Sequence, residues 1–438
     1  MQHPLPEGRL HRDPHRSPRL PQAGAQSTLE GNVRIAFVVS SLTLGGVQRT
    51  ACETASYLAG YGRDVTLITP TSREHDFFTP HPEVLRPALG IAEPPVGPRG
   101  LGNLRTVQRT LRARYSELGV DCVVVFADGT GLGAAAVTPA RRARIPVVAV
   151  AAGDPATEPR GAYLKALQRA EVIVAPTVQT ATAVGRAVTR SPRVEVIPPP
   201  LPRHSLSSDD GSQPAGAPLT ARPLRAAGPG VSAPAQRYSS TPPRTANRVL
   251  AVGSLRPHNG FDLLLRAFGR IRTEFPDWSL RIVGHGPEQP ALEALGEKLR
   301  LGRALEFIPP TDTVATQYRE AEIFALPSRS EVFALPLLEA MAAGSAVAAF
   351  DCPTGPREII GHRSSGILVP AGKTEIFAEE LGELMMTPRL RRHLGRRAPE
   401  AVAGHHPERV MQGWERLLHR LTSKAARRAG RGAGTSRS

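Results

Sequence analysis

Short apolar runs alternate with amphipathic helical patterns along the first half of the chain. The runs are rich in β-branched residues and predict strands over 34–41, 65–69, 121–128, 146–152 and 171–177. Helical patterns lie between them, for example over 48–59 and 162–170. Strands that are apolar on both faces and separated by helices are typical of a parallel sheet with helices on both sides. The first half is therefore predicted to be one doubly wound α/β domain.

The same alternation begins again in the second half. Further strands are predicted over 248–254, 279–285, 304–310, 322–328 and 345–351. Helices are predicted over 261–275 and 335–343, the second of them apolar over most of its length. This pattern predicts a second doubly wound domain of the kind that binds nucleotides.

Segments without hydrophobic periodicity separate and flank these domains. The predicted order is a disordered tail over 1–30, the first doubly wound domain over 31–202, a disordered linker over 203–247, the second doubly wound domain over 248–404, an amphipathic helix over 405–421 and a basic disordered tail over 422–438. The helix carries one apolar stripe, formed by Val410, Trp414, Leu417 and Leu421. Such a stripe predicts that the helix covers an apolar surface.

Composition narrows the class of protein. The chain has 438 residues, of which 40% are hydrophobic and 5% aromatic, and this excludes collagen, a coiled coil and a wholly disordered chain. Its three cysteines, Cys52, Cys122 and Cys352, are odd in number and unrelated in spacing, so neither a disulfide framework nor a metal site is predicted. No apolar run is long enough to span a membrane. We expect a cytoplasmic protein whose membrane contact, if there is one, is peripheral.

The net charge of +16 raises the question of a nucleic-acid partner. The segments 1–30, 203–248 and 421–438 carry 10 of these 16 charges, and all three have the composition of disordered chain. A solvated tail, or a weak contact with an anionic surface, therefore explains the charge better than a nucleic-acid site.

Two features suggest chemistry in the cleft between two such domains, where phosphate-bearing ligands bind. Gly45 and Gly46 follow the first strand and would let backbone N–H groups approach a phosphate, although a tight turn also requires glycine. Glu331 and Glu339 are eight residues apart, just before a predicted helix and inside it. Paired carboxylates can bind ribose and sugar hydroxyls, and the alternative is a helix-terminal acid and a surface glutamate.

Three stretches of the second half together resemble glycosyltransferase family 4. They are GSLRPHNGFDLLLRAFGRIRTEFPDWSLRIVGHGPEQPALEALGEKL, AEIFALPSRSEVFALPLLEAMAAGSAVAAFDCPTGPREII and GILVPAG. RIAFVVSSLTLGGVQRT is similar to the family in the first half. The resemblance implies a GT-B fold, in which two Rossmann-like domains face a central cleft. The domain over 31–202 would then be the acceptor-side domain, and the domain over 248–404 would bind the nucleotide sugar. The same resemblance implies a retaining sugar transfer from a UDP- or GDP-linked donor to a saccharide or lipid-linked acceptor, with no cofactor and no metal.

The resemblance also implies roles for individual residues. Glu339 would bind the ribose and Glu331 the hydroxyls of the donor sugar. The backbone near the diphosphate and sugar would come from Gly45, Gly46, Phe333, Ala334 and Leu335, and the base would lie near Gly284 and His285. Asp154 is a candidate catalytic group facing the acceptor, and the alternative is a strand-end turn aspartate before Pro155.

The sequence departs from the family pattern at the diphosphate site. Ser254 and Asn259 stand where the family usually has Arg and Lys, and Val332 replaces a glycine. Arg256, with His258, is a candidate substitute for the missing charge. The leading hypothesis is an active glycosyltransferase, and the alternatives are a non-catalytic GT-B scaffold with a degenerate diphosphate site and a nucleic-acid-binding protein acting through its basic tails.

Overall fold

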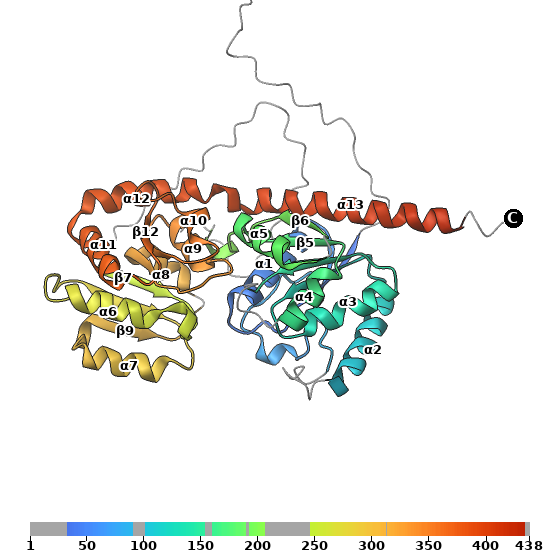
Figure 1. Cartoon of the computed structure of the whole chain (residues 1–438), viewed down its shortest axis with the longest axis horizontal. Helices are drawn as coiled ribbons and strands as arrows, with labels where there is room; N and C mark the ends of the chain where they lie inside the picture. Colours follow the sequence, from blue (N-terminus) through green and yellow to red (C-terminus); the bar gives the residue numbers. More distant parts are fainter. Residues whose placement is uncertain are drawn as a thin grey trace, which may run out of the picture. The chain divides into compact units, whose positions relative to one another are not determined.

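The computed structural model describes residues 33–90, 101–153, 160–189, 192–205, 246–311 and 313–433 (Figure 1). The first sheet is parallel throughout, with strand order β2-β1-β3-β4-β5-β6. Its strands are β1 (Arg34–Val38), β2 (Asp64–Ile68), β3 (Cys122–Ala127), β4 (Val147–Ala151), β5 (Val172–Ala175) and β6 (Arg193–Val196). Every residue of β3, β4 and β5 is buried, as the continuous apolar runs predict.

Five helices connect these strands and cover both faces of the sheet. They are α1 (Gly46–Gly60), α2 (Leu101–Glu117), α3 (Leu132–Arg142), α4 (Arg160–Gln168) and α5 (Val178–Ala187). Two apolar clusters lie on opposite sides of the sheet, one under α1 and the other under α2, α3 and α4. The predicted doubly wound domain is confirmed.

The second sheet is also parallel, with strand order β12-β11-β10-β7-β8-β9. Its strands are β7 (Ala246–Val252), β8 (Ser279–Val283), β9 (Leu305–Ile308), β10 (Ala321–Leu326), β11 (Ala346–Asp351) and β12 (Ile367–Pro370). The strand order reverses between β7 and β10. Ligands of doubly wound sheets bind at the carboxyl ends of the strands where such a reversal occurs. The loops after β7 and β10 are therefore expected to form a ligand-binding site.

The helices of the second half complete the same architecture. They are α6 (Phe261–Ile271), α7 (Gln289–Lys298), α8 (Val314–Glu320), α9 (Leu335–Ala342), α10 (Pro356–Ile359), α11 (Thr374–Met386) and α12 (Pro388–Ala401). One apolar cluster lies under α6 and α11, and another under α8 and α9. The two-domain GT-B fold expected from the resemblance is confirmed.

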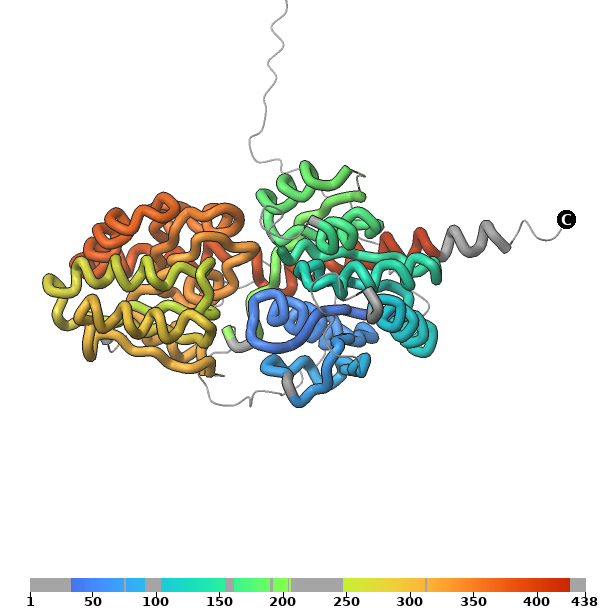
Figure 2. Tube along the Cα trace, turned by 60° about the horizontal axis from the view of Figure 1, so that its bottom comes forward, coloured from blue at the N-terminus to red at the C-terminus, as the bar shows by residue number. Residues whose placement is uncertain are grey.

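The terminal helix α13 (Pro407–Ala433) packs against the first domain, although the chain reaches it from the second (Figures 1 and 2). Its apolar stripe joins the cluster under α1, where the Trp414 and Phe37 rings lie 6.2 Å apart between centroids. The disordered tail expected over 422–438 is wrong as far as Ala433, because α13 continues to that residue. Alanine and arginine, which dominate this segment, are strong helix formers.

The linker expected over 203–247 falls largely outside the described residues. Residues 203–205 form a short 3₁₀ turn, and Ala246 and Asn247 already belong to β7. None of the helices described has both the length and the apolar character needed to cross a bilayer.

Candidate functional site

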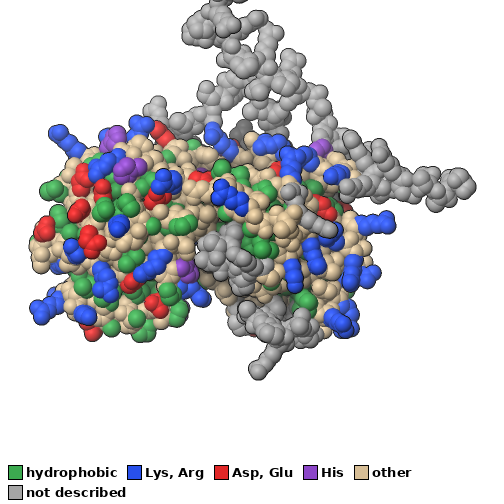
Figure 3. Space-filling model, in the orientation of Figure 1, with side chains coloured by type: hydrophobic (Ala, Val, Ile, Leu, Met, Phe, Trp, Pro, Cys, Tyr) green, Lys and Arg blue, Asp and Glu red, His purple; other side chains and the backbone are tan. Residues whose placement is uncertain are grey.

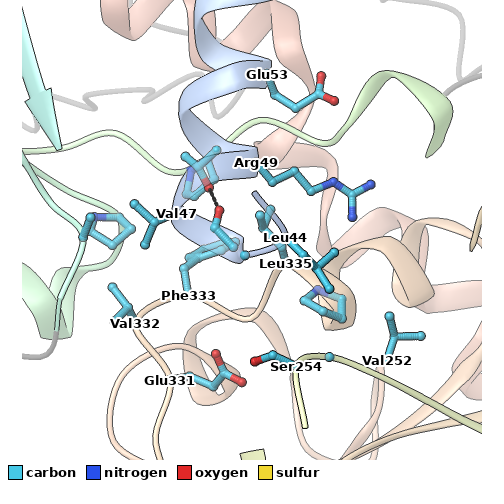
Figure 4. Close-up of a pocket in the computed structure, with 18 of the residues that line it drawn as sticks. Leu44, Val47, Arg49, Glu53, Val252, Ser254, Glu331, Val332, Phe333 and Leu335 are labelled. Carbon is cyan, nitrogen blue, oxygen red and sulfur yellow. Dashed lines mark hydrogen bonds between the residues drawn. The ribbon is translucent and has the colours of Figure 1, made fainter. Parts of the chain in front are cut away.

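A cavity of about 1050 Å³ lies between the two sheets. Its walls come from the loop after β1 and the start of α1 in the first domain, and from the loops after β7, β8 and β10 in the second. Figure 4 shows Arg49 extending from α1, and Ser254 and Glu331 on loops of the second domain. The cavity therefore opens where strand ends and helix N-termini converge, as the reversal of strand order predicts.

Most of the predicted donor-binding residues line this cavity. Its described lining includes Gly45, Gly46, Ser254, Asn259, Gly284, Glu331, Phe333 and Leu335. Gly284 also has a packing reason, because a Cβ there would lie 1.9 Å from the Gly253 carbonyl oxygen. Gly46 has open space around it, so no contact with the protein explains its lack of a side chain.

Other predicted residues lie away from the cavity wall. Arg256 and His285 are exposed and do not line the cavity. Ala334 is fully buried behind the wall, as the residue before α9. Asp154 lies outside the described residues. The proposed replacement of the missing charge by Arg256 therefore finds no support in the geometry.

Glu331 lies in the loop between β10 and α9, four residues before the helix begins. The Ser328 hydroxyl donates to its Oε1 at 2.7 Å. Burial raises the pKa of Glu331 to about 7, and the Ser328 hydrogen bond opposes this shift only in part. The carboxylate is thus held in a fixed orientation and is poorly solvated, so it is suited to accept hydrogen bonds from a ligand.

The backbone of Glu331 is connected to the first domain. The Thr354 hydroxyl donates to the Glu331 carbonyl oxygen, and the Thr354 backbone N–H donates to Gln179 Oε1 at 3.0 Å. Gln179 lies in the first turn of α5, where its own N–H and that of Val178 donate to the Glu358 carboxylate at 2.6 and 2.8 Å. These contacts fix the position of the Glu331 loop relative to α5.

Glu339 is almost fully buried on α9, with 1% of its surface exposed. The Tyr318 hydroxyl donates to its Oε2 at 2.8 Å, and burial and this carboxylate raise the pKa of Tyr318, which therefore stays protonated as a donor. Arg49, from the first domain, lies 2.6 Å from Oε1 and donates to Oε2 at 3.2 Å. Arg49 lines the cavity whereas Glu339 does not, so the ion pair with Arg49 lies between this carboxylate and the cavity.

Sequence reasoning missed both partners of Glu339. Tyr318 is 21 residues away along the chain and Arg49 is 290, and no local pattern joins such positions. One signal was available for Arg49, since it lies in the first turn of a helix that has no acidic residue there. A cation is unfavourable at a helix N-terminus, so its presence indicates a partner elsewhere or a ligand.

Ser254 and Asn259 are bonded to each other. The Asn259 side-chain amide donates to the Ser254 carbonyl oxygen at 2.5 Å and to its Oγ at 2.9 Å. Gly260, with φ of 67°, follows as the N-cap of α6, and a Cβ there would lie 2.1 Å from the Pro327 carbonyl oxygen. The loop after β7 is thus well ordered, but these two neutral side chains offer a diphosphate no positive charge.

The raised pKa of Glu331 predicts a pH-dependent stability. Its folded-state value of about 7 exceeds the usual 4.5, so between these values the folded chain holds a proton that the unfolded chain releases. The contribution of Glu331 to the free energy of unfolding is therefore fully present below about pH 4.5. It is lost as the pH rises to about 7, which lowers the free energy of unfolding by about 3 kcal/mol. Glu331→Gln should remove this part of the slope, measured as the free energy of unfolding in urea from about pH 5 to about pH 8. A variant with the wild-type slope would contradict the assignment.

Two family models match the chain. The model described as "Glycosyltransferase Family 4" matches residues 44–203, and the one described as "Glycosyl transferases group 1" matches 232–401. Relatives include an uncharacterized glycosyltransferase of Haemophilus influenzae, 31% identical over 39% of this chain and 48% of that protein. The amylovoran biosynthesis glycosyltransferase AmsD of Erwinia amylovora is 32% identical over 42% of this chain and 51% of its own length. The chain thus spans about half the length of these curated relatives.

Solved structures show the same fold over nearly the whole chain. A sucrose-phosphate synthase from Thermosynechococcus elongatus superimposes with a TM-score of 0.69 at 19% identity, covering 90% of this chain and all of that one. HepE of Anabaena, in complex with UDP and glucose, gives 0.68 at 16% identity, covering 89% of this chain and all of that one. In sequence the two halves of the chain match glycosyltransferase family models, and its fold is the two-domain GT-B fold of these solved structures, so the predicted resemblance is confirmed.

Proposed function

We propose that this chain transfers a sugar, with retention and without a metal, from a UDP- or GDP-linked donor to a saccharide or lipid-linked acceptor. The observation that carries the proposal is the pair Glu331 and Glu339, one on the wall of the interdomain cavity and the other directly behind that wall, at the point where the second sheet reverses its strand order. The structure of HepE in complex with UDP and glucose supports a nucleotide-sugar donor, and the similarity to AmsD, an amylovoran biosynthesis glycosyltransferase, supports a saccharide product.

The chemistry follows from the charges that develop during transfer. The bond between the anomeric carbon and the donor phosphate oxygen breaks, and its electron pair stays on the diphosphate. The acceptor hydroxyl oxygen forms the new bond on the same face, and its proton passes to the departing phosphate oxygen. Glu331 would orient the sugar through its hydroxyls, and the N–H groups at the start of α1 would face the leaving group.

An anionic membrane surface is part of the proposal for the acceptor. On α2, Arg105, Arg109 and Arg112 are exposed at spacings of four and three residues, which places them on one face of the helix. In the view of Figure 3, basic and acidic side chains are intermixed over the second domain, whereas basic ones prevail over the first. Such a face suits a peripheral contact with acidic lipid headgroups.

The competing function is a GT-B scaffold without turnover, and the bonded pair Ser254 and Asn259 favours it. A thermal-shift screen of the full chain with UDP, GDP, ADP and their sugar conjugates separates the two. A ligand that binds only the folded state at 100 times its Kd stabilises that state by about 2.7 kcal/mol, so the melting temperature should rise by several degrees for one base. Loss of that shift in Glu339→Gln would assign it to this cavity, and no shift with any nucleotide would overturn the proposal.

A further inference from the structure

The cavity contains little positive charge for a site that would bind a diphosphate. Among the described residues that line it, Arg49 is the one arginine or lysine, whereas Glu53 and Glu331 are both acidic. A nucleoside diphosphate gains negative charge as the sugar leaves, and this charge requires cations or N–H donors close by. Arg49 is therefore the first candidate for the cation that the second domain lacks.

Three neighbouring groups do not supply this charge. Arg256 is exposed and does not line the cavity. Arg329 forms a bidentate ion pair with Asp262, at 2.7 and 2.8 Å. His258 does line the cavity, but partial burial and the nearby Arg256 lower its pKa and so disfavour the charged ring.

The position of Arg49 fits contact with a phosphate. It lies in the first turn of α1, where its backbone N–H donates to the Gly45 carbonyl oxygen at 3.0 Å. Its guanidinium carbon lies 5.8 Å from the centroid of the Phe78 ring, which also lines the cavity. The side chain is 16% exposed, and Glu339 holds its charged end. A guanidinium is thus kept next to the helix N-terminus and the glycine pair that would face the diphosphate.

We propose that Arg49 is the cation that binds the donor diphosphate, and that the donor itself releases it from Glu339. The inference rests on the proposed function. The ribose hydroxyls donate to Glu339 in place of the guanidinium, and the guanidinium then binds phosphate oxygens, for which its planar pair of donors is well suited. When the sugar departs, the electron pair of the broken bond stays on the phosphate oxygen, and Arg49 stabilises that charge. Donor binding therefore replaces the ion pair between Arg49 and Glu339 by contacts of both side chains with the same ligand.

The test compares nucleoside diphosphate with monophosphate binding to the full chain. The probes are UDP and UMP, or the GDP and GMP or ADP and AMP pair, according to the base that binds. In wild type the ratio of the monophosphate Kd to the diphosphate Kd measures the contribution of the terminal phosphate. We expect Arg49→Gln to lower this ratio at least about tenfold, since a hydrogen bond to a charged group contributes that much. Arg49→Lys, which keeps the charge but loses the planar donor pair, should give an intermediate ratio.

Arg256→Gln is the matched control and should leave the ratio unchanged. If Arg49 only holds Glu339, both Arg49 variants weaken the two nucleotides equally and the ratio stays at the wild-type value, which would overturn the inference. A ratio that falls in Arg256→Gln instead would overturn it as well. The proposed function fails separately, when no diphosphate binds wild type. Arg49→Lys keeps a cation next to Glu339, so the comparison remains decisive if Arg49→Gln folds poorly.

Discussion

Glu339→Gln is expected to weaken binding of the nucleoside diphosphate by at least about 100-fold, because two ribose hydroxyls lose a charged acceptor. The substitution keeps the shape of the side chain and its position beside Tyr318. It also leaves Arg49 without its carboxylate partner, so the free energy of unfolding should fall at the same time. Isothermal titration of the folded variant with the nucleotide that binds wild type measures the loss of affinity directly.

Glu297→Gln serves as the control for this experiment. Glu297 is exposed on α7 and does not line the cavity, so the same loss of charge there should leave the affinity unchanged. An affinity of Glu339→Gln within about threefold of wild type would show that this carboxylate does not contact the nucleotide.

Glu331→Gln is expected to lower turnover by about 100- to 1000-fold while leaving nucleoside diphosphate affinity nearly unchanged. The reason is that an oriented, poorly solvated carboxylate at the reacting sugar contributes mainly in the transition state. In wild type, activity should rise with pH through about 7 as Glu331 ionises, and this limb should disappear in the variant. The measurement is release of nucleoside diphosphate from the donor, with and without acceptor.

Ser328→Ala provides a graded comparison. It removes the hydroxyl that donates to Glu331 but keeps the carboxylate, so the expected loss of turnover is about tenfold and the apparent pKa of the activity limb should rise. A loss of nucleotide affinity in Glu331→Gln with unchanged turnover at saturating donor would instead place Glu331 in nucleotide binding alone.

The sheets were predictable where strands are buried on both faces. The apolar runs of β3, β4 and β5 predict strands that are buried on both faces, and every residue in them is buried. The two strands left out of the prediction, β6 and β12, lie at sheet edges and have four residues each. β6 reads RVEV and has no fully buried residue, so its sequence carries no apolar run to indicate a strand.

Only the part of the candidate site that is formed by residues close together in the sequence could be predicted. Glu331 and Glu339 lie in one loop and helix, so their proximity could be expected from an eight-residue spacing. Arg256 was expected to face the diphosphate because it lies in the same loop as Ser254, but the direction of a loop side chain depends on what packs around it. Arg49 was missed because its contact with Glu339 requires the two domains to face each other.

The sequence by itself determined two doubly wound domains and the carboxylates of the second, because hydrophobic periodicity and short-range spacing are local properties of the chain. Only the tertiary structure decided that α13 completes the core of the first domain, that Ser254 and Asn259 bond to each other, and that Arg49 covers Glu339. These contacts depend on how separate elements pack against one another. The burial and electrostatic complementarity that select them act between residues 290 positions apart for Arg49 and Glu339, and still further apart for Phe37 and Trp414.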